Sequence, residues 1–109
     1  MNNTVVHYAT QTGKDPFEAW RDRLKDRVAK ASITRRVLRI ELGDFGDYRR
    51  VGDGVSELRI DVGPRYRVYF GTVGSTVVVL LLGGDKGSQA RDIARAKAYW
   101  NDFQAWYEH

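Results

Sequence analysis

Four residues in the second half of the chain have the types and spacing to bind a phosphate group. Arg59, Arg67 and Tyr69 occupy alternating positions in two consecutive β-type segments, and Arg65 lies in the turn between them. An arginine guanidinium stays charged and presents a planar fork of N–H donors that matches phosphate oxygens. Two guanidiniums and a phenol could therefore hold a phosphate and stabilise charge developing on it. The structural alternative is a solvated sheet face with an Asp61–Arg67 ion pair.

A second candidate is the segment 83–89, Gly-Gly-Asp-Lys-Gly-Ser-Gln, which follows an apolar run and precedes a helix. Backbone N–H groups and the helix dipole at such a junction favour anions, and Lys86 adds a cation. The glycine spacing is not that of a P-loop. A strand-to-helix turn that needs glycine for backbone reasons alone is the alternative.

The basic charge is concentrated in residues 14–41, which contain nine basic and five acidic residues. Such a face could contact RNA phosphates or be an ordinary solvated helix surface. Asp44 and Asp47 form a pair of carboxylates, but no third ligand stands near them. His7 and His109 are separated by nearly the whole chain, and cysteine is absent. The sequence therefore predicts no metal, no cofactor and no disulfide.

The composition predicts one folded domain over residues 1–109. The chain has a net charge of +4 and 42% apolar residues, which are enough to build a core without disulfides. The longest apolar run, residues 77–82, is far too short to span a membrane, and no signal-peptide core stands at the N-terminus. We therefore expect a cytoplasmic protein.

The first half of the chain predicts a strand and a helical hairpin. Residues 4–10 are rich in β-branched and aromatic side chains. Asp15 is placed to cap a helix that begins at Pro16, with Glu18 completing a capping box. The helix-spaced apolar stripe Phe17, Trp20, Leu24 and Val28 changes phase to Ile33, Val37 and Ile40. Ser32 could cap the second helix of this hairpin.

The second half predicts β-segments over residues 48–51, 55–62, 66–73 and 76–82, the last apolar on both sides as in a central strand. A three-residue loop at 63–65 would pair Ile60 with Val68, Asp61 with Arg67, and Arg59 with Tyr69. This register predicts one apolar core face and one polar face.

A terminal helix is expected to begin after Asp85 or Ser88. It carries an apolar stripe at helical spacing, made of Ile93, Ala96, Trp100, Phe103 and Tyr107. Tyr99 and Trp106 form a second aromatic line on a neighbouring face. They could bind a partner protein or simply complete the core.

Several segments together resemble a known family. These are Pro-Phe-Glu-Ala-Trp at 16–20, Asp-Gly-Val-Ser-Glu-Leu-Arg-Ile at 53–60, Gly-Pro-Arg-Tyr-Arg-Val-Tyr-Phe at 63–70, Leu-Leu-Leu-Gly-Gly-Asp-Lys-Gly-Ser-Gln at 80–89, and Ala-Arg-Asp-Ile-Ala-Arg-Ala-Lys at 90–97. From about residue 6 to residue 100, the chain resembles the phage-derived addiction module killer branch of RelE/ParE-type toxins, close to HigB-like proteins.

The resemblance implies an α+β toxin fold with element order β-α-α-β-β-β-α. In it, a helical hairpin packs on a mostly antiparallel four-stranded sheet. It also implies the toxin of a type II toxin–antitoxin module, which inhibits translation as a ribosome-dependent mRNA endoribonuclease. In this family, cleavage proceeds without a metal, by attack of a ribose 2′-OH on its neighbouring phosphate. The partners implied are a helix-turn-helix antitoxin and mRNA in the ribosomal decoding site, with no membrane involved.

Carried over by motif, Arg67 is expected to stabilise the scissile phosphate, with Arg59 and Lys86 as further catalytic cations. Tyr69 is added as a catalytic candidate because strand alternation places it on the same face as Arg59 and Arg67. The remaining candidates are assigned to RNA binding, namely Arg49, Arg50, Arg65 and Gln89, or to partner binding, namely Tyr99 and Trp106. The general acid and base are unassigned, since arginine hardly deprotonates. A ParE-like, non-catalytic inhibitor of DNA gyrase and an inactive antitoxin-binding relic are the alternatives, because one fold serves several functions.

Overall fold

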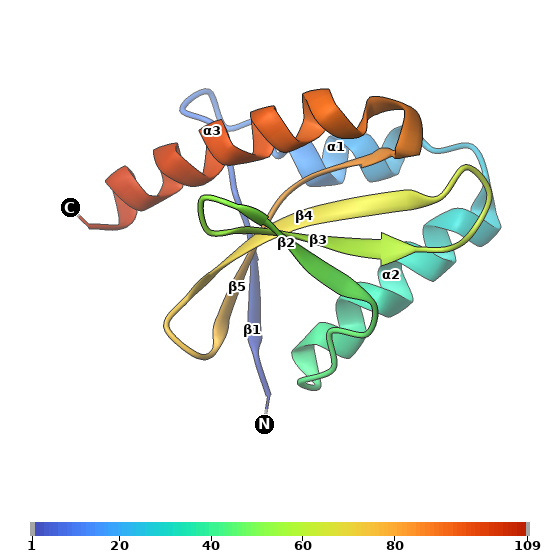
Figure 1. Ribbon diagram of the computed structural model, residues 1–109, viewed down its shortest axis with the longest axis horizontal. Helices are drawn as coiled ribbons and strands as arrows, with labels where there is room; N and C mark the ends of the chain where they lie inside the picture. Colours follow the sequence, from blue (N-terminus) through green and yellow to red (C-terminus); the bar gives the residue numbers. More distant parts are fainter. Residues whose placement is uncertain (1, 109) are drawn as a thin grey trace.

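A computed structural model describes residues 2–108 (Figure 1). In chain order, the elements of this part are β1 (Thr4–His7), α1 (Pro16–Arg23), α2 (Arg27–Glu41), β2 (Tyr48–Gly52), β3 (Val55–Ile60), β4 (Tyr66–Val73), β5 (Val77–Asp85), the short 3-10 turn η1 (Lys86–Ser88) and α3 (Gln89–Tyr107). No helix among these residues is long and apolar enough to cross a membrane.

The strands form one mixed sheet in the order β1-β5-β4-β3-β2. β1 is parallel to β5, and the other neighbouring strands are antiparallel. The expected four-stranded sheet with order β-α-α-β-β-β-α is therefore wrong, because four strands, and not three, lie between α2 and α3. The extra member is the edge strand β2, which joins β3 in a hairpin. Its turn residues Asp53 and Gly54 both have positive φ, 54° and 83°, which matches the twist of paired strands.

The predicted register of β3 against β4 is also wrong, by two residues. Arg59 pairs with Arg67 and Leu58 with Val68, so the connection is a five-residue loop. It is longer than expected because a local turn forms within it, in which Arg65 N donates to Val62 O at 3.1 Å and Arg65 has φ of 63°. A shift of two residues keeps every side chain on its predicted face but changes its partner.

The helical hairpin is present, but its break lies earlier than predicted. Asp15 caps α1 as expected, accepting a hydrogen bond from Glu18 N. The second helix is capped by Asp26 and not by Ser32, because the Asp26 carboxylate accepts the N–H groups of Val28 and Ala29. Val28 therefore lies in the first turn of a new helix and is 67% exposed, although it was predicted to continue the first apolar stripe.

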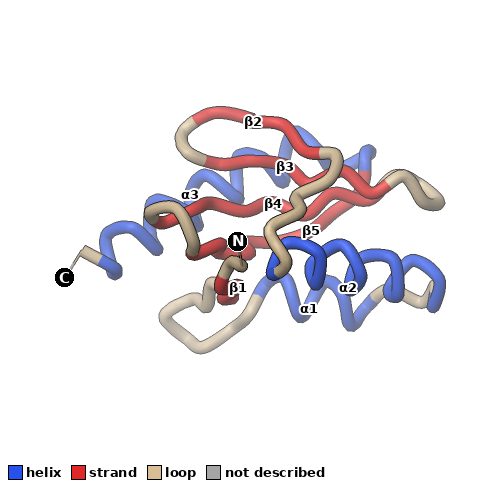
Figure 2. The backbone as a smooth tube through the Cα atoms, turned by 90° about the horizontal axis from the view of Figure 1, so that it is seen from below, coloured by secondary structure: helices blue, strands red, loops and turns tan. Residues whose placement is uncertain are grey.

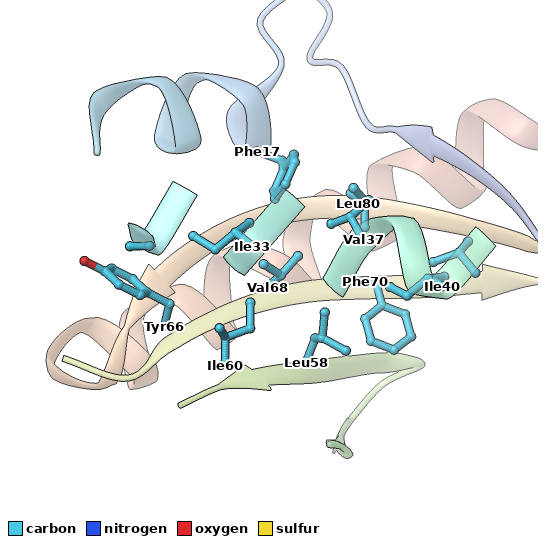
Figure 3. Close-up of a cluster of buried hydrophobic side chains, with 12 residues drawn as sticks. Phe17, Ile33, Val37, Ile40, Leu58, Ile60, Tyr66, Val68, Phe70 and Leu80 are labelled. Carbon is cyan, nitrogen blue, oxygen red and sulfur yellow. The ribbon is translucent and has the colours of Figure 1, made fainter. Parts of the chain in front are cut away.

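Each face of the sheet has its own core. Figure 2 shows α1 and α2 together on one side of the sheet and α3 along the other. The first core lies between α1, α2 and the sheet. Its side chains, shown in Figure 3, include Phe17 and Ile33 from the helices and Leu58, Val68 and Leu80 from the strands. On the α3 face, a second core gathers Tyr8, Val55, Tyr69, Val79, Leu81, Leu82, Ala96 and Trp100. The prediction of a simply polar second face is therefore wrong over much of its length.

Candidate functional site

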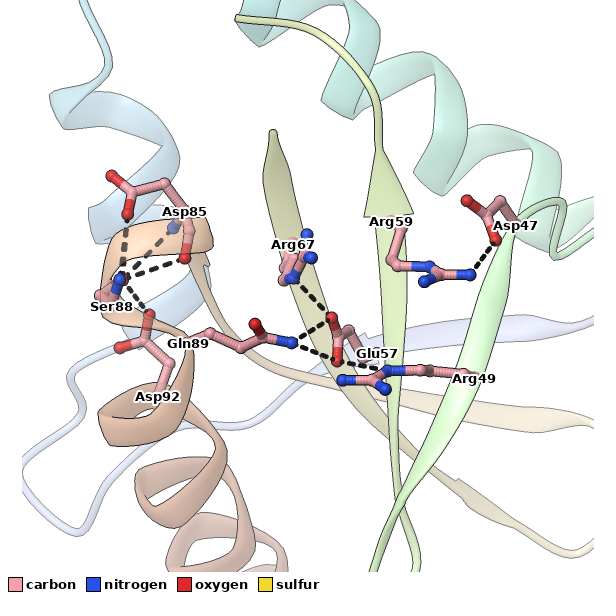
Figure 4. Close-up of polar contacts among 9 residues, drawn as sticks. All are labelled: Asp47, Arg49, Glu57, Arg59, Arg67, Asp85, Ser88, Gln89 and Asp92. Atoms are coloured by element: carbon pink, nitrogen blue, oxygen red, sulfur yellow. Dashed lines mark hydrogen bonds and ion pairs between the residues drawn. The ribbon is translucent and has the colours of Figure 1, made fainter. Parts of the chain in front are cut away.

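A buried carboxylate organises the polar part of the α3 face. Glu57, on β3, is fully buried. Its Oε1 lies 2.6 Å from Nε of Arg67 on β4, an ion pair whose angle is not that of a hydrogen bond. Arg49 Nε, on β2, donates to Oε2 at 3.2 Å. Gln89 Nε2, at the start of α3, donates to Oε1 and Oε2 at 3.0 and 3.2 Å (Figure 4). A buried charge requires such partners.

Strand register brings these groups together. Glu57 lies directly opposite Arg49 on one neighbouring strand and opposite Tyr69 on the other. Arg67 is two positions from Tyr69, so it lies on the same face at a diagonal from Glu57. Gln89 reaches the carboxylate because η1 turns the chain back over the sheet at the end of β5. Three residues predicted to serve phosphate chemistry or RNA binding thus contact one carboxylate, that of Glu57, which the sequence did not mark as a functional residue.

Arg67 connects this network to a cleft of about 270 Å³. The cleft is lined by Asp47, Arg59, Ile60, Asp61, Arg65 and Arg67. Only 8% of Arg67 is exposed. Because Glu57 engages Nε, the two Nη nitrogens are the donors left for a ligand. Tethering a guanidinium in this way orients its fork before any ligand arrives.

The cleft brings three guanidiniums to one place. Arg59 lies directly opposite Arg67 in the strand register, and like charges in that position repel. Asp47 offsets part of this charge, accepting from Arg59 Nη2 at 3.0 Å (Figure 4). Arg65 Nε lies 3.6 Å from Asp61 Oδ1. Three cations against two exposed carboxylates leave the cleft suited to an anion.

Arg36, on α2, holds the wall of this cleft in place. Its Nη1 donates to the Arg59 carbonyl at 2.5 Å, and its Nη2 donates to the carbonyls of Phe45 and Asp47 at 3.0 and 3.1 Å. Burial lowers the pKa of Arg36, and the nearby Arg39 lowers it further. The hydrogen bonds join α2, β3 and the loop before β2, so the position of Asp47 depends on tertiary contacts.

Tyr69 does not line the cleft. It is fully buried, and its hydroxyl has no hydrogen-bond partner among residues 2–108. Burial raises the pKa of the Tyr69 phenol, and the carboxylates of Glu57 and Asp92 raise it further. The hydroxyl therefore lies under α3, between the polar network and the second core.

The other predicted residues lie apart from the cleft. Lys86 is exposed on η1, and Arg50 is exposed on the edge strand β2, one position from Arg49 and so on the opposite face. Tyr99 stacks on Tyr8 with ring centroids 4.9 Å apart, so it belongs partly to the second core. Trp106 is 70% exposed near the end of α3. Arg59, Arg65 and Arg67 meet, whereas the partner candidates lie elsewhere.

One group of potential metal ligands was not predicted. His7, Asp15 and Glu18 offer ligand atoms within 4.8 Å of one another. His7 Nδ1 lies 2.6 Å from Asp15 Oδ2, while the other oxygen of Asp15 caps α1. Glu18 is paired with Arg21 at 2.5 Å. Each of these groups thus has a structural partner within the protein. The fold brings them together because β1 ends beside the first turn of α1, which sequence distance does not reveal.

Comparison with known proteins identifies a relative of this chain. No family model matches the chain. A protein of Haemophilus influenzae, described as an uncharacterized protein, is 48% identical over 81 residues, which cover 74% of this chain and 82% of that protein. The chain belongs to the family of this Haemophilus protein. The Haemophilus protein's description states no activity, so the resemblance to toxins stays a prediction.

Proposed function

We propose that this protein is the toxin of a type II toxin–antitoxin module and that it cleaves mRNA in the ribosomal decoding site. The observation that carries the proposal is the cleft in which Arg59, Arg65 and Arg67 converge, with Arg67 tethered by the buried Glu57. The resemblance of segments 53–70 and 80–97 to RelE/ParE-type toxins supplies the reaction class. Because translating ribosomes are in the cytoplasm, the proposal implies a cytoplasmic protein.

The reaction is an internal transesterification. The ribose 2′-oxygen forms a bond to the adjacent phosphorus, the bond from phosphorus to the 5′-oxygen breaks, and the products carry a 2′,3′-cyclic phosphate and a 5′-hydroxyl. One proton leaves the 2′-OH and one is delivered to the departing 5′-oxygen. Negative charge accumulates on the phosphate oxygens in the transition state, where fixed cations are most effective.

The cleft supplies groups that bind the phosphate and groups that accept the 2′-OH proton. The Nη donors of Arg67 bind the scissile phosphate, and Arg59 and Arg65 stabilise its developing charge. Asp47 and Asp61 line the same cleft and are carboxylates able to accept the 2′-OH proton. Lys86 contacts RNA that extends past the end of β5. Tyr69 is assigned a positioning role beside the Glu57 network, because its hydroxyl is buried and does not reach the cleft.

The proposed partner is a helix-turn-helix antitoxin. Trp106 is the stronger contact candidate, since it is 70% exposed beside a groove of about 320 Å³ that it lines with Phe103 and Tyr107. Large exposed aromatic side chains are typical of interface anchors. Tyr99 contributes less, because one face of its ring is covered by Tyr8.

The test is to map RNA 5′ ends in a purified translation system, with and without ribosomes. The variant is Arg59→Gln/Arg65→Gln, which removes two cleft cations and keeps the Arg67–Glu57 pair. The matched control is Arg27→Gln/Arg35→Gln, which removes the same charge from exposed positions on α2. We expect ribosome-dependent cuts that fall at least tenfold in the cleft variant and less than twofold in the control.

Equal loss in both variants would contradict the role of the cleft. If translation and RNA remain intact while the protein arrests growth, the endoribonuclease proposal is wrong, and inhibition of DNA gyrase supercoiling is the next assay.

A further inference from the structure

A second polar cavity, of about 260 Å³, lies between α1 and α3. It exists because β1 pairs with β5 only as far as Leu80, so no strand lies beside the end of β5 on that side. The cavity is lined by Lys14, Pro16, Trp20, Arg23, residues 82–85, Ser88, Arg91, Asp92, Arg95 and Tyr99. None of these residues lines the arginine cleft.

Two glycines form its floor and permit close approach from both sides. A Cβ at Gly83 would collide with the Trp20 ring of α1, and a Cβ at Gly84 would collide with the Asp92 carboxylate of α3. These glycines were predicted to belong to an anion-binding junction. The structure gives them a packing role that allows α1 and α3 to approach the same strand.

Four cations surround the cavity, and most of them are free. Lys14 comes from the loop before α1, Arg23 from the end of α1, and Arg91 and Arg95 from successive turns of α3. Within residues 2–108, the side chains of Lys14, Arg23 and Arg95 form no ion pair or hydrogen bond, and Arg91 Nε is 3.8 Å from Asp92 Oδ1. Cations from separate segments that converge without counter-charges are suited to an anion.

The two carboxylates of the lining are already occupied within the protein. Asp85 Oδ1 accepts a hydrogen bond from Ser88 N at 3.1 Å and so caps η1. The Ser88 hydroxyl donates to Asp92 Oδ2 (Figure 4). Asp92 is buried, being 3% exposed. The charge that faces the cavity is therefore predominantly positive.

Aromatic rings complete the lining. Trp20 and Tyr99 come from opposite walls and are both only partly buried. One face of Tyr99 stacks on Tyr8, and Trp20 meets Tyr66 edge-on at 6.0 Å, so each ring is held in place by the core. Cationic grooves combined with fixed aromatic rings are the pattern by which proteins bind single-stranded nucleic acid.

We infer that this α1–α3 cavity binds one nucleotide of single-stranded RNA, its phosphate on the four cations and its base against Trp20. The inference rests on the proposed function for its substrate class. Gly84, in the cavity floor, is the register partner of Arg67 in the cleft. Neighbouring strands are about 4.8 Å apart, so a single strand of RNA can occupy both sites.

The experiment is an anisotropy titration of a fluorescein-labelled hexanucleotide of 2′-O-methyl RNA, which cannot be cleaved because its 2′-oxygens are blocked. The cavity variant is Arg23→Gln/Arg95→Gln, and the control with the same charge is Arg27→Gln/Arg35→Gln. We expect the cavity variant to weaken binding at least tenfold. It should also reduce the magnitude of the slope of log K against log salt by about 0.7, because one phosphate is no longer neutralised. The control should change affinity less than twofold.

A second readout uses adenosine 5′-monophosphate and the indole N–H resonances, with Trp20 assigned through Trp20→Phe. The Trp20 resonance should shift and the Trp106 resonance should not. Equal weakening of hexanucleotide binding in both double variants, or an unshifted Trp20, overturns the nucleotide site. If the cavity passes both tests while no RNA is cut in the translation system, the nuclease proposal fails and the site stands. If cuts occur but the cavity variant binds the hexanucleotide normally, the nuclease proposal stands and the nucleotide site fails.

Discussion

Nε of Arg67 lies 2.6 Å from Oε1 of Glu57, and both side chains are almost completely removed from solvent. The pair links strands β3 and β4 and also orients the one arginine that belongs to both the buried network and the open cleft. Stability and the geometry of the candidate site therefore depend on the same contact.

Replacing Glu57 with glutamine should destabilise the protein strongly. The change keeps the shape of the side chain but leaves Arg49 and Arg67 without their buried counter-charge. Breaking a buried pair of this kind costs about 3 kcal/mol, which urea unfolding would measure. The control is Asp47→Asn, which breaks an exposed pair with Arg59 and should cost less than about 1 kcal/mol. Similar losses in the two variants would show that the network contributes little to stability.

Replacing Tyr69 with phenylalanine should not destabilise the protein. The Tyr69 hydroxyl is buried without a hydrogen-bond partner in the described part of the chain. Removing an unsatisfied buried polar group should raise the free energy of unfolding by about 1 kcal/mol. RNA cleavage should be retained, because the hydroxyl does not line the cleft. A variant that folds normally but no longer cuts RNA would instead return Tyr69 to a catalytic role.

Three of the tyrosines should titrate at a higher pH in the folded protein than in urea. Burial raises the pKa values of Tyr8, Tyr69 and Tyr66, and the Asp102 carboxylate raises that of Tyr8 further. Absorbance of phenolate should show these three ionising at a higher pH in the folded protein than in urea, where they should titrate near the ordinary pKa of about 10. Since the raised pKa belongs to the folded state, the associated stability is present below about pH 10 and falls as the pH rises above it. The fall should be smaller in Tyr69→Phe.

Gly71→Ala should be destabilising and partly rescued by a smaller ring on α3. A Cβ at Gly71 would lie 2.5 Å from Cε3 of Trp100. Overpacking of this kind costs about 1 to 3 kcal/mol, measured by urea unfolding. In Gly71→Ala/Trp100→Phe, the loss should be smaller than the sum of the two single losses, because the substitutions share one contact. Additive losses would mean that the glycine is required for backbone reasons and not for the close approach of Trp100.

Local physics explains what the sequence predicted well. The face of each side chain in β3 and β4 follows from the alternation of the chain, so Leu58, Ile60 and Val68 were correctly placed in a core despite a wrong register. Asp15 and Pro16 marked the start of α1, since helix capping depends on a few neighbouring residues. The phosphate-type candidates Arg59, Arg65 and Arg67 came from the same alternation and from the turn between the strands.

Tertiary structure decided everything that depends on which segment meets which. The parallel docking of β1 on β5 carries no local signature, because one strand's sequence does not specify its partner's direction. The two-residue shift between β3 and β4 was set by a turn inside the loop, and it placed Glu57, not Arg59, opposite Tyr69. Gln89 contacts Glu57 only because η1 turns α3 over the sheet. Arg23 and Arg95 line one cavity only because β1 is short. Backbone periodicity and capping are encoded over a few residues, whereas these contacts form between segments tens of residues apart and depend on how the whole chain packs.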